Sequence, residues 1–358
     1  MTISTPTLLL DEVKCRANIN IMAAKARKHK LVFRPHFKTH QNLSIGRWFK
    51  EEGVKCITVS SLSMAEYFSN DWDDITVAFP VNILEIDTIN KLSLKIKLNL
   101  LVESIAHVNF LKQHLAHTAG IFIKIDVGYH RTGISADNEM LMDQVISIIQ
   151  QSPKLKFKGF LAHAGHTYKC RKQDEVIAIH QSSLRIMSQL KSKYQTEFPD
   201  LITSLGDTPS CSMAEDFSGL DEIRPGNFVF YDLSQVRIGS CTSEQIAVAM
   251  ACPIVALHKE RHELVIYGGA VHFSKDRLEE EAEGTIYGRV AEKSGRGWGE
   301  IITGMYVKNL SQEHGIIKVP EEKIKSYQVG DILLILPVHS CLTAQCVKTY
   351  HTLGFQKL

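Results

Sequence analysis

The feature that most constrains the fold is an alternation of short apolar runs with longer amphipathic stretches through the first 235 residues. The runs are rich in Val, Ile, Leu and Phe, as buried strands are, and the stretches between them repeat apolar residues at helical spacing. Such alternation predicts an α/β fold with a parallel sheet, and eight units suit a closed (β/α)8 barrel. An open doubly wound sheet is the alternative. The expected strands are 31–34, 55–59, 75–79, 98–102, 121–126, 157–161, 201–204 and 222–224.

The helices expected between these strands begin in several cases after Ser, Asn or Asp, the residues preferred at a helix N-cap. They are 41–52, 62–69, 83–92, 104–117, 138–151 and 173–195.

The sequence pattern changes after about residue 235. From there on, strand-like runs alternate with Gly, Pro and charged turns and show little helical periodicity. We therefore expect a barrel domain over residues 1–235 and a C-terminal β domain over residues 236–358. The segment 279–300 is polar and contains several glycines, so we expect a loop excursion there.

The charge balance excludes some classes of partner. The chain carries 41 basic and 39 acidic residues, which argues against binding to nucleic acid or to an anionic membrane. It has no run of eighteen apolar residues and no secretory N-terminal pattern. Its eight cysteines form no CxxC pair. We expect a soluble, cytoplasmic protein with mostly reduced thiols.

The segment "RPHFKTHQ", residues 34–41, places charged side chains directly after an apolar strand. In a barrel of this kind the reactive groups lie at the carboxyl ends of the strands. Lys38 can therefore point into the barrel mouth, where partial desolvation and neighbouring cations such as Arg34 would favour a Schiff-base nucleophile. The alternative is an ordinary solvated surface lysine.

Two further segments place polar side chains after the fifth and sixth strands. In "DVGYHRTGI", Arg131 can face a pyridine nitrogen and keep it unprotonated, or it can instead form an ion pair with Asp126. In "LAHAGHTY", His163 can stack on a planar cofactor, His166 can transfer protons, and Tyr168 can donate a hydrogen bond. Structural histidines are the alternative interpretation.

Two glycine-containing turns, "SLGDTPS" and "RPGNFVF", follow the last two strands. In barrels the loops at these positions often bind phosphate through backbone N–H groups and hydroxyls. The candidate residues are Gly206, Thr208, Ser210, Gly226 and Asn227. These positions match the three groups of pyridoxal 5'-phosphate (PLP) that need partners. The lysine after the first strand suits its aldehyde, the arginine after the fifth suits its ring nitrogen, and the turns after the last two strands suit its phosphate.

The C-terminal segment "PVHSCLTAQC" contains a possible metal pair. In an extended chain, residues two apart point to the same side, so His339 and Cys341 would face one site together. Imidazole and thiolate are zinc ligands, and two protein ligands leave positions for water or substrate, as in a catalytic site. A buried cysteine beside a capping histidine is the alternative.

The combination of these segments resembles the D-threonine aldolase and D-serine dehydratase family of alanine-racemase-like, fold-type III PLP enzymes. "RPHFKTHQ" resembles the family's RPHxKTHK motif, with Gln41 in place of its last lysine, and the likeness continues through "DVGYHRTGI", "AHAGHTY", "GDTPS", "IRPGNFVFYD" and "HSC". The resemblance implies a barrel with a C-terminal β domain, usually in a homodimer. It also implies that Lys38 carries the cofactor, Arg131 faces the pyridine nitrogen, His163 lies against the ring, and His339 with Cys341 binds a divalent metal.

The resemblance implies a lyase that acts on β-hydroxy-D-amino acids, with two possible outcomes. If Lys38 removes the α-proton, the β-hydroxyl leaves and the enzyme is a D-serine dehydratase. If His166, or hydroxide on the metal, takes the hydroxyl proton, the Cα–Cβ bond breaks and the enzyme is a D-threonine aldolase. "HSC" resembles the metal pair of eukaryotic D-serine dehydratases, which favours the first. A D-threo-3-hydroxyaspartate dehydratase, an amino-acid racemase and a non-catalytic PLP carrier are the remaining alternatives.

Overall fold

The computed structural model describes residues 3–358 and divides into two compact units, which are described separately. The barrel unit comprises Ile21–Lys38 and Ile45–Gly226. The β unit comprises the chain up to Asn20, together with Thr39–Ser44 and Asn227–Leu358. The short motif that contains Lys38 and Thr39 is therefore divided between the two units.

The sheet of the barrel unit contains a strand at each of the eight expected positions, in the order β2-β10-β9-β8-β6-β5-β4-β3, and all of these pairs are parallel. The predicted fold class is confirmed. The strands are β2 (Val32–Phe33), β3 (Ile57–Val59), β4 (Asp74–Pro80), β5 (Lys97–Val102), β6 (Ala119–Asp126), β8 (Leu155–Ala162), β9 (Ile202–Leu205) and β10 (Glu222–Ile223), with the short β7 (Ile134–Ser135) beside β6.

The barrel closes between β2 and β3 through contacts just beyond the end of β2. His36 forms an isolated parallel bridge with Thr58. The N–H of Phe37 donates to the carbonyl of Thr58 at 2.8 Å, and the N–H of Thr58 donates to the carbonyl of Pro35 at 2.9 Å. The segment that carries Lys38 therefore belongs to the barrel's closing seam.

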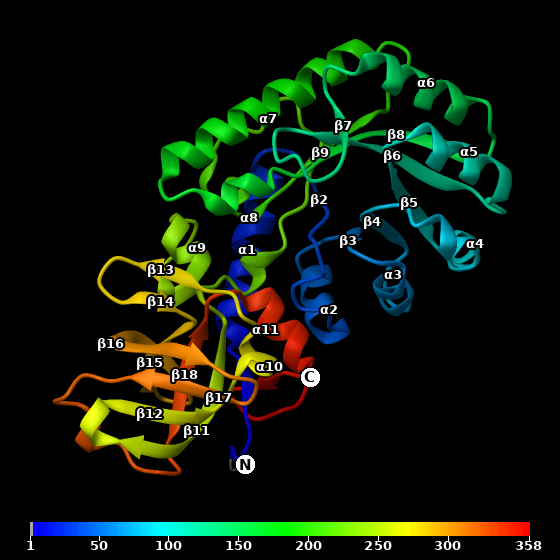
Figure 1. Cartoon of the computed structure of the whole chain (residues 1–358). Coiled ribbons are helices and arrows are strands. Elements are labelled where there is room, and N and C mark those ends of the chain that lie inside the picture. The colour runs from blue at the N-terminus through cyan, green and yellow to red at the C-terminus, as the bar shows by residue number, and fades with distance from the viewer. Residues whose placement is uncertain (1–2) are drawn as a thin grey trace. The chain divides into compact units, whose positions relative to one another are not determined.

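The helices of the barrel unit connect successive strands and lie along the outer side of the sheet (Figure 1). Ser61, Ser104, Asn138 and Asp207 cap α3, α5, α6 and α8, each by accepting a backbone N–H in the first turn. The helices are α2 (Leu43–Glu51), α3 (Leu62–Phe68), α4 (Ile86–Lys95), α5 (Ile105–His114), α6 (Glu139–Gln150), α7 (Gln173–Tyr194) and α8 (Thr208–Met213), with 3-10 turns η1 (Ile83–Glu85) and η2 (Gly165–Lys169). Helix α1 (Glu12–Lys28) precedes them.

A buried ionic network ties strands on both sides of this seam. The guanidinium of Arg34 donates to Glu222 on β10 at 2.6 Å and to Asp74 on β4 at 2.5 Å. The hydroxyl of Ser204 on β9 donates to the other oxygen of Glu222 at 2.6 Å, and Arg224 donates to Ser204 at 2.7 Å. Arg34, Glu222, Ser204 and Arg224 are all buried, so each charge depends on these partners.

The β unit is built on antiparallel strands in which β12, β17, β16, β15, β18 and β11 pair in turn and β11 pairs again with β12 (Figure 1). Strand β1, near the N-terminus, adds to β11 on one side and to β19 on the other. The strands are β1 (Thr7–Leu10), β11 (Val248–His258), β12 (Glu263–Tyr267), β15 (Gly288–Ser294), β16 (Gly297–Leu310), β17 (His314–Lys318), β18 (Ile332–Pro337) and β19 (His351–Thr352). Its helices are α9 (Leu233–Ile238), α10 (Ala270–Phe273) and α11 (Ser340–Val347), with 3-10 turns η3 (Asn227–Val229), η4 (Ser243–Gln245), η5 (Lys259–Arg261) and η6 (Ile324–Ser326).

The expectation of a loop over residues 279–300 is wrong. The hairpin of β13 (Leu278–Glu280) and β14 (Gly284–Ile286) is followed directly by β15 and the start of β16. Gly295 lies in the turn between β15 and β16, and Gly284 begins β14; both have positive φ, which glycine adopts readily. The exposed face of these strands accounts for the polar composition.

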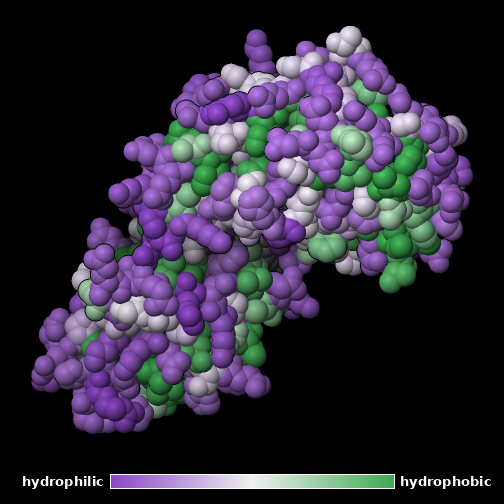
Figure 2. Space-filling view, turned by 45° about the horizontal axis from the view of Figure 1, so that its top comes forward, coloured by the Kyte–Doolittle hydropathy of each residue, from purple (hydrophilic) through white to green (hydrophobic). Residues whose placement is uncertain are grey.

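On the face drawn in Figure 2, hydrophilic side chains predominate, with smaller hydrophobic areas between them. None of the helices found from residue 3 onward is long and apolar enough to cross a membrane.

The network around Arg34 predicts a large effect of Glu222→Ala. The substitution leaves the buried Arg34 with Asp74 alone, and removing one partner of a buried ion pair costs about 3–5 kcal/mol. We expect the free energy of unfolding, measured by urea denaturation, to fall by that order. Glu66→Ala removes the partner of Lys91 on the surface and should leave stability near the wild-type value. Equal stability of the two variants would contradict the assigned role.

Candidate active site

Lys38 lies five residues beyond the end of β2, on the closing seam of the barrel, and it is exposed. Its backbone N–H donates to Nδ1 of His36 at 3.4 Å. The positive charge of Lys38 helps to lower the pKa of both His36 and His163, so the amine lies close to both imidazoles. The structure thus brings Lys38 and His163 together.

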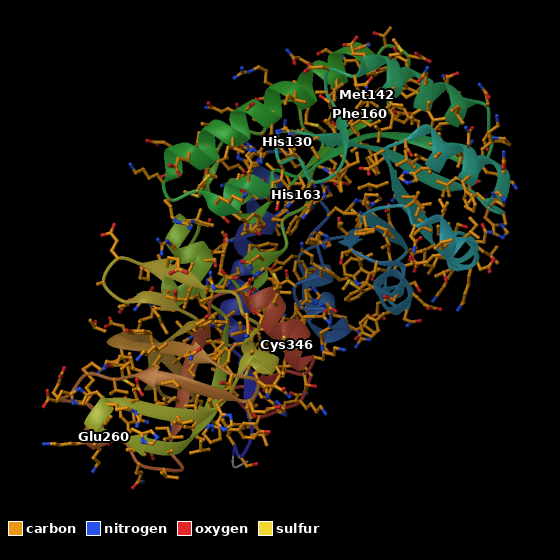
Figure 3. The ribbon with its side chains drawn as sticks, viewed as in Figure 1. His130, Met142, Phe160, His163, Glu260 and Cys346 are labelled. Atoms are coloured by element: carbon orange, nitrogen blue, oxygen red, sulfur yellow. The ribbon has the colours of Figure 1, made fainter. Side chains whose placement is uncertain are left out.

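His163 follows the carboxyl end of β8 (Figure 3) and its ring orientation is fixed by a hydrogen bond. Nδ1 donates to the carbonyl of Gly206 at 2.7 Å. Burial lowers the pKa of His163 well below its ordinary value, and the charges of Lys38, Lys124 and Arg131 add to the effect. The imidazole is therefore neutral near pH 7, with Nδ1 protonated, and suits contact with a planar ring rather than with an anion.

Gly206 meets a steric requirement between β9 and β10. A Cβ at this position would lie 2.5 Å from the backbone nitrogen of Arg224, so a larger residue would push the two strands apart. The same glycine supplies the carbonyl that holds His163. The close approach of these strands is therefore coupled to the orientation of the imidazole.

Tyr168 and Thr208, both expected in the cofactor site, are in contact. The N–H of Thr208, the first residue of α8, donates to the phenol oxygen of Tyr168 at 3.2 Å. Asp207 caps the same helix by accepting the N–H of Ser210 at 2.8 Å and the hydroxyl of Thr167 at 2.9 Å. The turn predicted to bind phosphate is thus the first turn of α8, and hydrogen bonds to Tyr168 and Thr167 connect it to the segment after β8.

His166 lies in the 3-10 turn η2, three residues beyond His163. Its ring is stacked with that of Tyr129, with centroids 6.1 Å apart, and Tyr129 also meets His163 edge to face. Burial lowers the pKa of His166, so the ring is neutral near pH 7. Within residues 3–358, no hydrogen-bond partner is found for its buried Nδ1. A neutral imidazole of this kind can accept a proton.

Arg131 follows the loop after β6, with its guanidinium 5.1 Å from the centroid of the Tyr129 ring. The alternative pairing with Asp126 does not form, because Asp126 accepts a hydrogen bond from His130 at 2.8 Å and the N–H groups of residues 128–130 at 3.0 Å. The charge of Arg131 also contributes to the lowered pKa of His36 and His163. It therefore lies near the same group of residues as Lys38.

Lys124 and Arg224 belong to this charged cluster although the sequence analysis did not select them. Burial lowers the pKa of Lys124 to about 7, and the charges of Arg224 and Arg131 contribute. Arg224 is buried, and desolvation lowers its pKa to about 10. A charged residue within the apolar run "IFIKID" was the available signal for Lys124, because a lysine on a buried strand needs a role.

The proposed metal residues adopt a different backbone geometry from the one expected. His339 is the N-cap of α11 and Cys341 lies in its first turn, so the segment is not extended and the alternation argument is wrong there. Burial by itself would lower the pKa of His339, but hydrogen bonds to Asp276 and Cys341 raise it to about 11. The imidazole and the thiol are therefore in contact, as a donor pair requires.

Cys341 is surrounded by polar groups of the β unit. Its Sγ lies 3.2 Å from the hydroxyl of Thr39, the residue after Lys38 in the chain, and 3.4 Å from the amide nitrogen of Asn227. The Asn227 amide also donates to Asp232 at 2.6 Å. The side chain of Asn227, predicted to bind cofactor, is thus engaged beside Cys341, while Gly226 ends the barrel unit.

Comparisons with known proteins match the two parts of the chain separately. The alanine racemase N-terminal domain model matches residues 10–234, and the putative serine dehydratase domain model matches residues 247–353. The chain belongs to the alanine-racemase-like family of D-serine dehydratases and D-threonine aldolases. It is a PLP-dependent lyase of this family.

The similar proteins include two dehydratases. The enzyme is 29% identical to the D-serine dehydratase of Dictyostelium discoideum, covering 98% of this chain and 94% of the relative. It is 25% identical to the D-threo-3-hydroxyaspartate dehydratase of Delftia sp. (strain HT23), covering 99% and 95%. A solved structure of D-threo-3-hydroxyaspartate dehydratase, described as a cysteine-to-alanine mutant in the metal-free form, has a TM-score of 0.91 at 24% identity, covering 98% and 94%.

The electrostatics of the barrel unit fit an anionic aldehyde such as PLP. Lys38, Lys124 and Arg131 each lower the pKa of His163, and Arg224 helps to lower the pKa of Lys124. A phosphate group would balance this excess of positive charge, which raises the energy of the cluster without a counterion. The residues present therefore fit the cofactor of the family.

The pKa of His40, the second histidine of the motif, predicts acid sensitivity. His40 is buried in the β unit and burial lowers its pKa to about 3, whereas an unfolded histidine titrates near 6.5. Below about pH 6.5 the unfolded chain binds a proton that the folded chain does not. The free energy of unfolding should therefore fall by about 1.4 kcal/mol for each pH unit between 6.5 and 3.

Urea denaturation between pH 7.5 and pH 5 checks this expectation. The glutamine in His40→Gln cannot be protonated. The change in the free energy of unfolding per pH unit should therefore be smaller by about 1.4 kcal/mol, the contribution of one proton. Replacement of the exposed His314 by Gln is the control and should preserve the wild-type slope. An unchanged slope in His40→Gln would contradict the assignment.

Proposed function

We propose that this lyase is a PLP- and divalent-metal-dependent D-serine dehydratase that converts D-serine to pyruvate and ammonia. The observation that carries the proposal is the contact between the His339 imidazole and the Cys341 thiol at the start of α11. A nitrogen–sulfur donor pair can bind a divalent metal, and in a lyase such a metal can help a hydroxyl group to leave. The D-serine dehydratase relative at 29% identity supports this choice of substrate.

Residues of the barrel unit would hold the cofactor. The Lys38 amine would attach its aldehyde, the neutral His163 would pack on its ring, and Arg131 would face the pyridine nitrogen. Tyr168 and the turn formed by Gly206, Thr208 and Ser210 would bind polar groups of the cofactor, together with the backbone of Gly226 and Asn227. PLP, when bound, supplies a sink for the electrons released at the substrate Cα.

Residues of the β unit would hold the metal. Imidazole and thiolate are donors that suit zinc, with manganese or magnesium as alternatives if oxygen ligands predominate. Within residues 3–358, no cluster of three or more His, Cys, Asp or Glu side chains is arranged to hold a metal ion. Water and substrate would complete the shell, as in catalytic sites. The metal would act as a Lewis acid on the β-hydroxyl.

The proton transfers follow from the protonation states of the chain's own residues. The Lys38 amine, when it does not hold the cofactor, would take the proton from the substrate Cα. His163 is held by Gly206 and stays neutral, so it orients without exchanging protons near pH 7. Net loss of water from D-serine would release 2-aminoacrylate, which tautomerises to an imine and is hydrolysed to pyruvate and ammonia.

D-threonine aldolase is the alternative activity, and the state of His166 favours it. The neutral ring with its unpartnered Nδ1, among the described residues, could take the proton of the β-hydroxyl instead. Cleavage of Cα–Cβ would then give glycine and acetaldehyde. A D-threo-3-hydroxyaspartate dehydratase would need cations for a second carboxylate, which Arg131 and Lys124 could supply.

A product assay tests the proposal. The PLP-loaded protein with D-serine and zinc should release pyruvate, and a chelator should abolish the release. Lys38→Ala should lose the visible absorbance of bound PLP and reduce turnover by about 10²–10⁴-fold, because the attachment point and the base are both absent. Replacement of the surface Lys91 by Ala is the control and should leave both unchanged.

Other products would point to the alternatives. Glycine and acetaldehyde from D-threonine, with no pyruvate from D-serine, would replace the dehydratase with an aldolase. Oxaloacetate and ammonia from D-threo-3-hydroxyaspartate alone would indicate the second dehydratase, and racemisation that survives the chelator would indicate a racemase. No spectral change with any D-amino acid would indicate a PLP carrier.

We also propose that the protein is a cytoplasmic homodimer, since the family is usually dimeric. Light scattering on the PLP-loaded protein should give twice the mass of one chain, and a monomer mass would contradict it.

A further inference from the structure

Asp276 forms a contact with His339 that the assigned roles do not explain. Asp276 lies between α10 and β13, and its Oδ2 is 3.1 Å from Nδ1 of His339, which is 63 residues further along the chain. The two side chains are 37% and 38% exposed. A pair as exposed as this one contributes little to stability, because solvent screens it. The contact also fixes the orientation of the imidazole.

The contact determines which ring nitrogen remains for a metal. An imidazole has two nitrogens, and a carboxylate that accepts a hydrogen bond from Nδ1 leaves Nε2 as the nitrogen that can bind a metal after losing its proton. The ring also contacts Cys341, so with Nδ1 directed to Asp276 the free nitrogen is the one available to share a ligand with the thiol. Metal-binding histidines commonly depend on such a carboxylate for ring orientation and basicity.

Ser274 in turn positions Asp276. Its hydroxyl donates to Oδ2 of Asp276 at 3.0 Å and accepts the N–H of Asp276 at 3.1 Å. The backbone of Ser274 has φ 70° and ψ −171°, a conformation that is almost confined to glycine. A serine occupies this position although the backbone is strained. Its hydroxyl, which glycine lacks, is the group that holds the carboxylate.

We propose that Asp276 is a positioning residue for the metal site, and that Ser274 supports it, so that the chain Ser274–Asp276–His339 directs Nε2 of His339 toward the ion shared with Cys341. The inference rests on the proposed function in one respect, the binding of a divalent metal by His339 and Cys341. Asp276 acts through His339 and is not itself a ligand.

Zinc binding to the PLP-loaded, metal-stripped protein tests the proposal directly, by competition with a chromophoric chelator. Asp276→Asn and Asp276→Ala should weaken the zinc Kd by about 10–100-fold, the range found for such supporting groups. Asp331→Asn, which alters a turn cap elsewhere in the β unit, is the matched control and should leave the zinc Kd unchanged.

Ser274→Gly separates positioning from general stability. Glycine relieves the backbone strain, so the unfolding temperature of the metal-free variant should be equal to or above that of the wild type, while its zinc affinity falls. If Ser274 were only structural, its replacement would not raise the unfolding temperature while weakening zinc binding. This variant also keeps the test decisive if the Asp276 variants fail to fold.

Cobalt(II) shows whether Asp276 is a ligand. At saturating cobalt, Asp276→Asn should keep the thiolate-to-metal absorbance band, and Cys341→Ser should lose it. Wild-type zinc affinity in both Asp276→Asn and Ser274→Gly would overturn the inference, as would loss of the band in Asp276→Asn. If the wild type itself binds no zinc, the metal part of the proposed function fails as well, and the two failures are distinguishable.

Discussion

The pairing of Arg34 with Glu222 and Asp74 is the interaction on which the barrel unit depends. A guanidinium buried at the end of the first barrel strand is tolerated only because two carboxylates from other strands meet it. Arg34 directly follows β2, the strand that opens the sheet order, and its partners lie on β10 and β4, so the ionic contacts join segments that are distant in sequence. Lys38 lies four residues after Arg34, so this network anchors the start of the segment that carries Lys38.

Excess positive charge is the second organising feature of the barrel unit. Burial lowers the pKa of Lys124 to about 7, with smaller contributions from Arg224 and Arg131. Burial also lowers the pKa of both His36 and His163, and the charges of Lys38 and Arg131 add to the effect at each imidazole. Neutral histidines among these cations leave the charge to be balanced by a ligand. An anionic cofactor would therefore neutralise the positive charge of these residues as well as supply the chemistry.

The motif "RPHFKTHQ" contributes residues to both units. Arg34 and His36 belong to the barrel unit, in the buried ionic network and at the closing seam. Thr39 and His40 belong to the β unit, where the Thr39 hydroxyl contacts Cys341 and the His40 carbonyl accepts the hydroxyl of Tyr350 at 2.6 Å. Substitutions within this one motif would therefore act on the barrel unit and on the surroundings of Cys341 separately.

The sequence by itself determined the order of elements, because the period of apolar residues distinguishes strands from helices locally, and all eight barrel strands lie where that period placed them. It also selected residues that prove to be neighbours, such as His163 and Gly206, because carboxyl ends of parallel strands meet at one rim. Only the tertiary structure decided the partners that come from distant segments. Glu222 reaches Arg34 across 188 positions of the chain and Asp276 reaches His339 across 63, and no local period records such contacts.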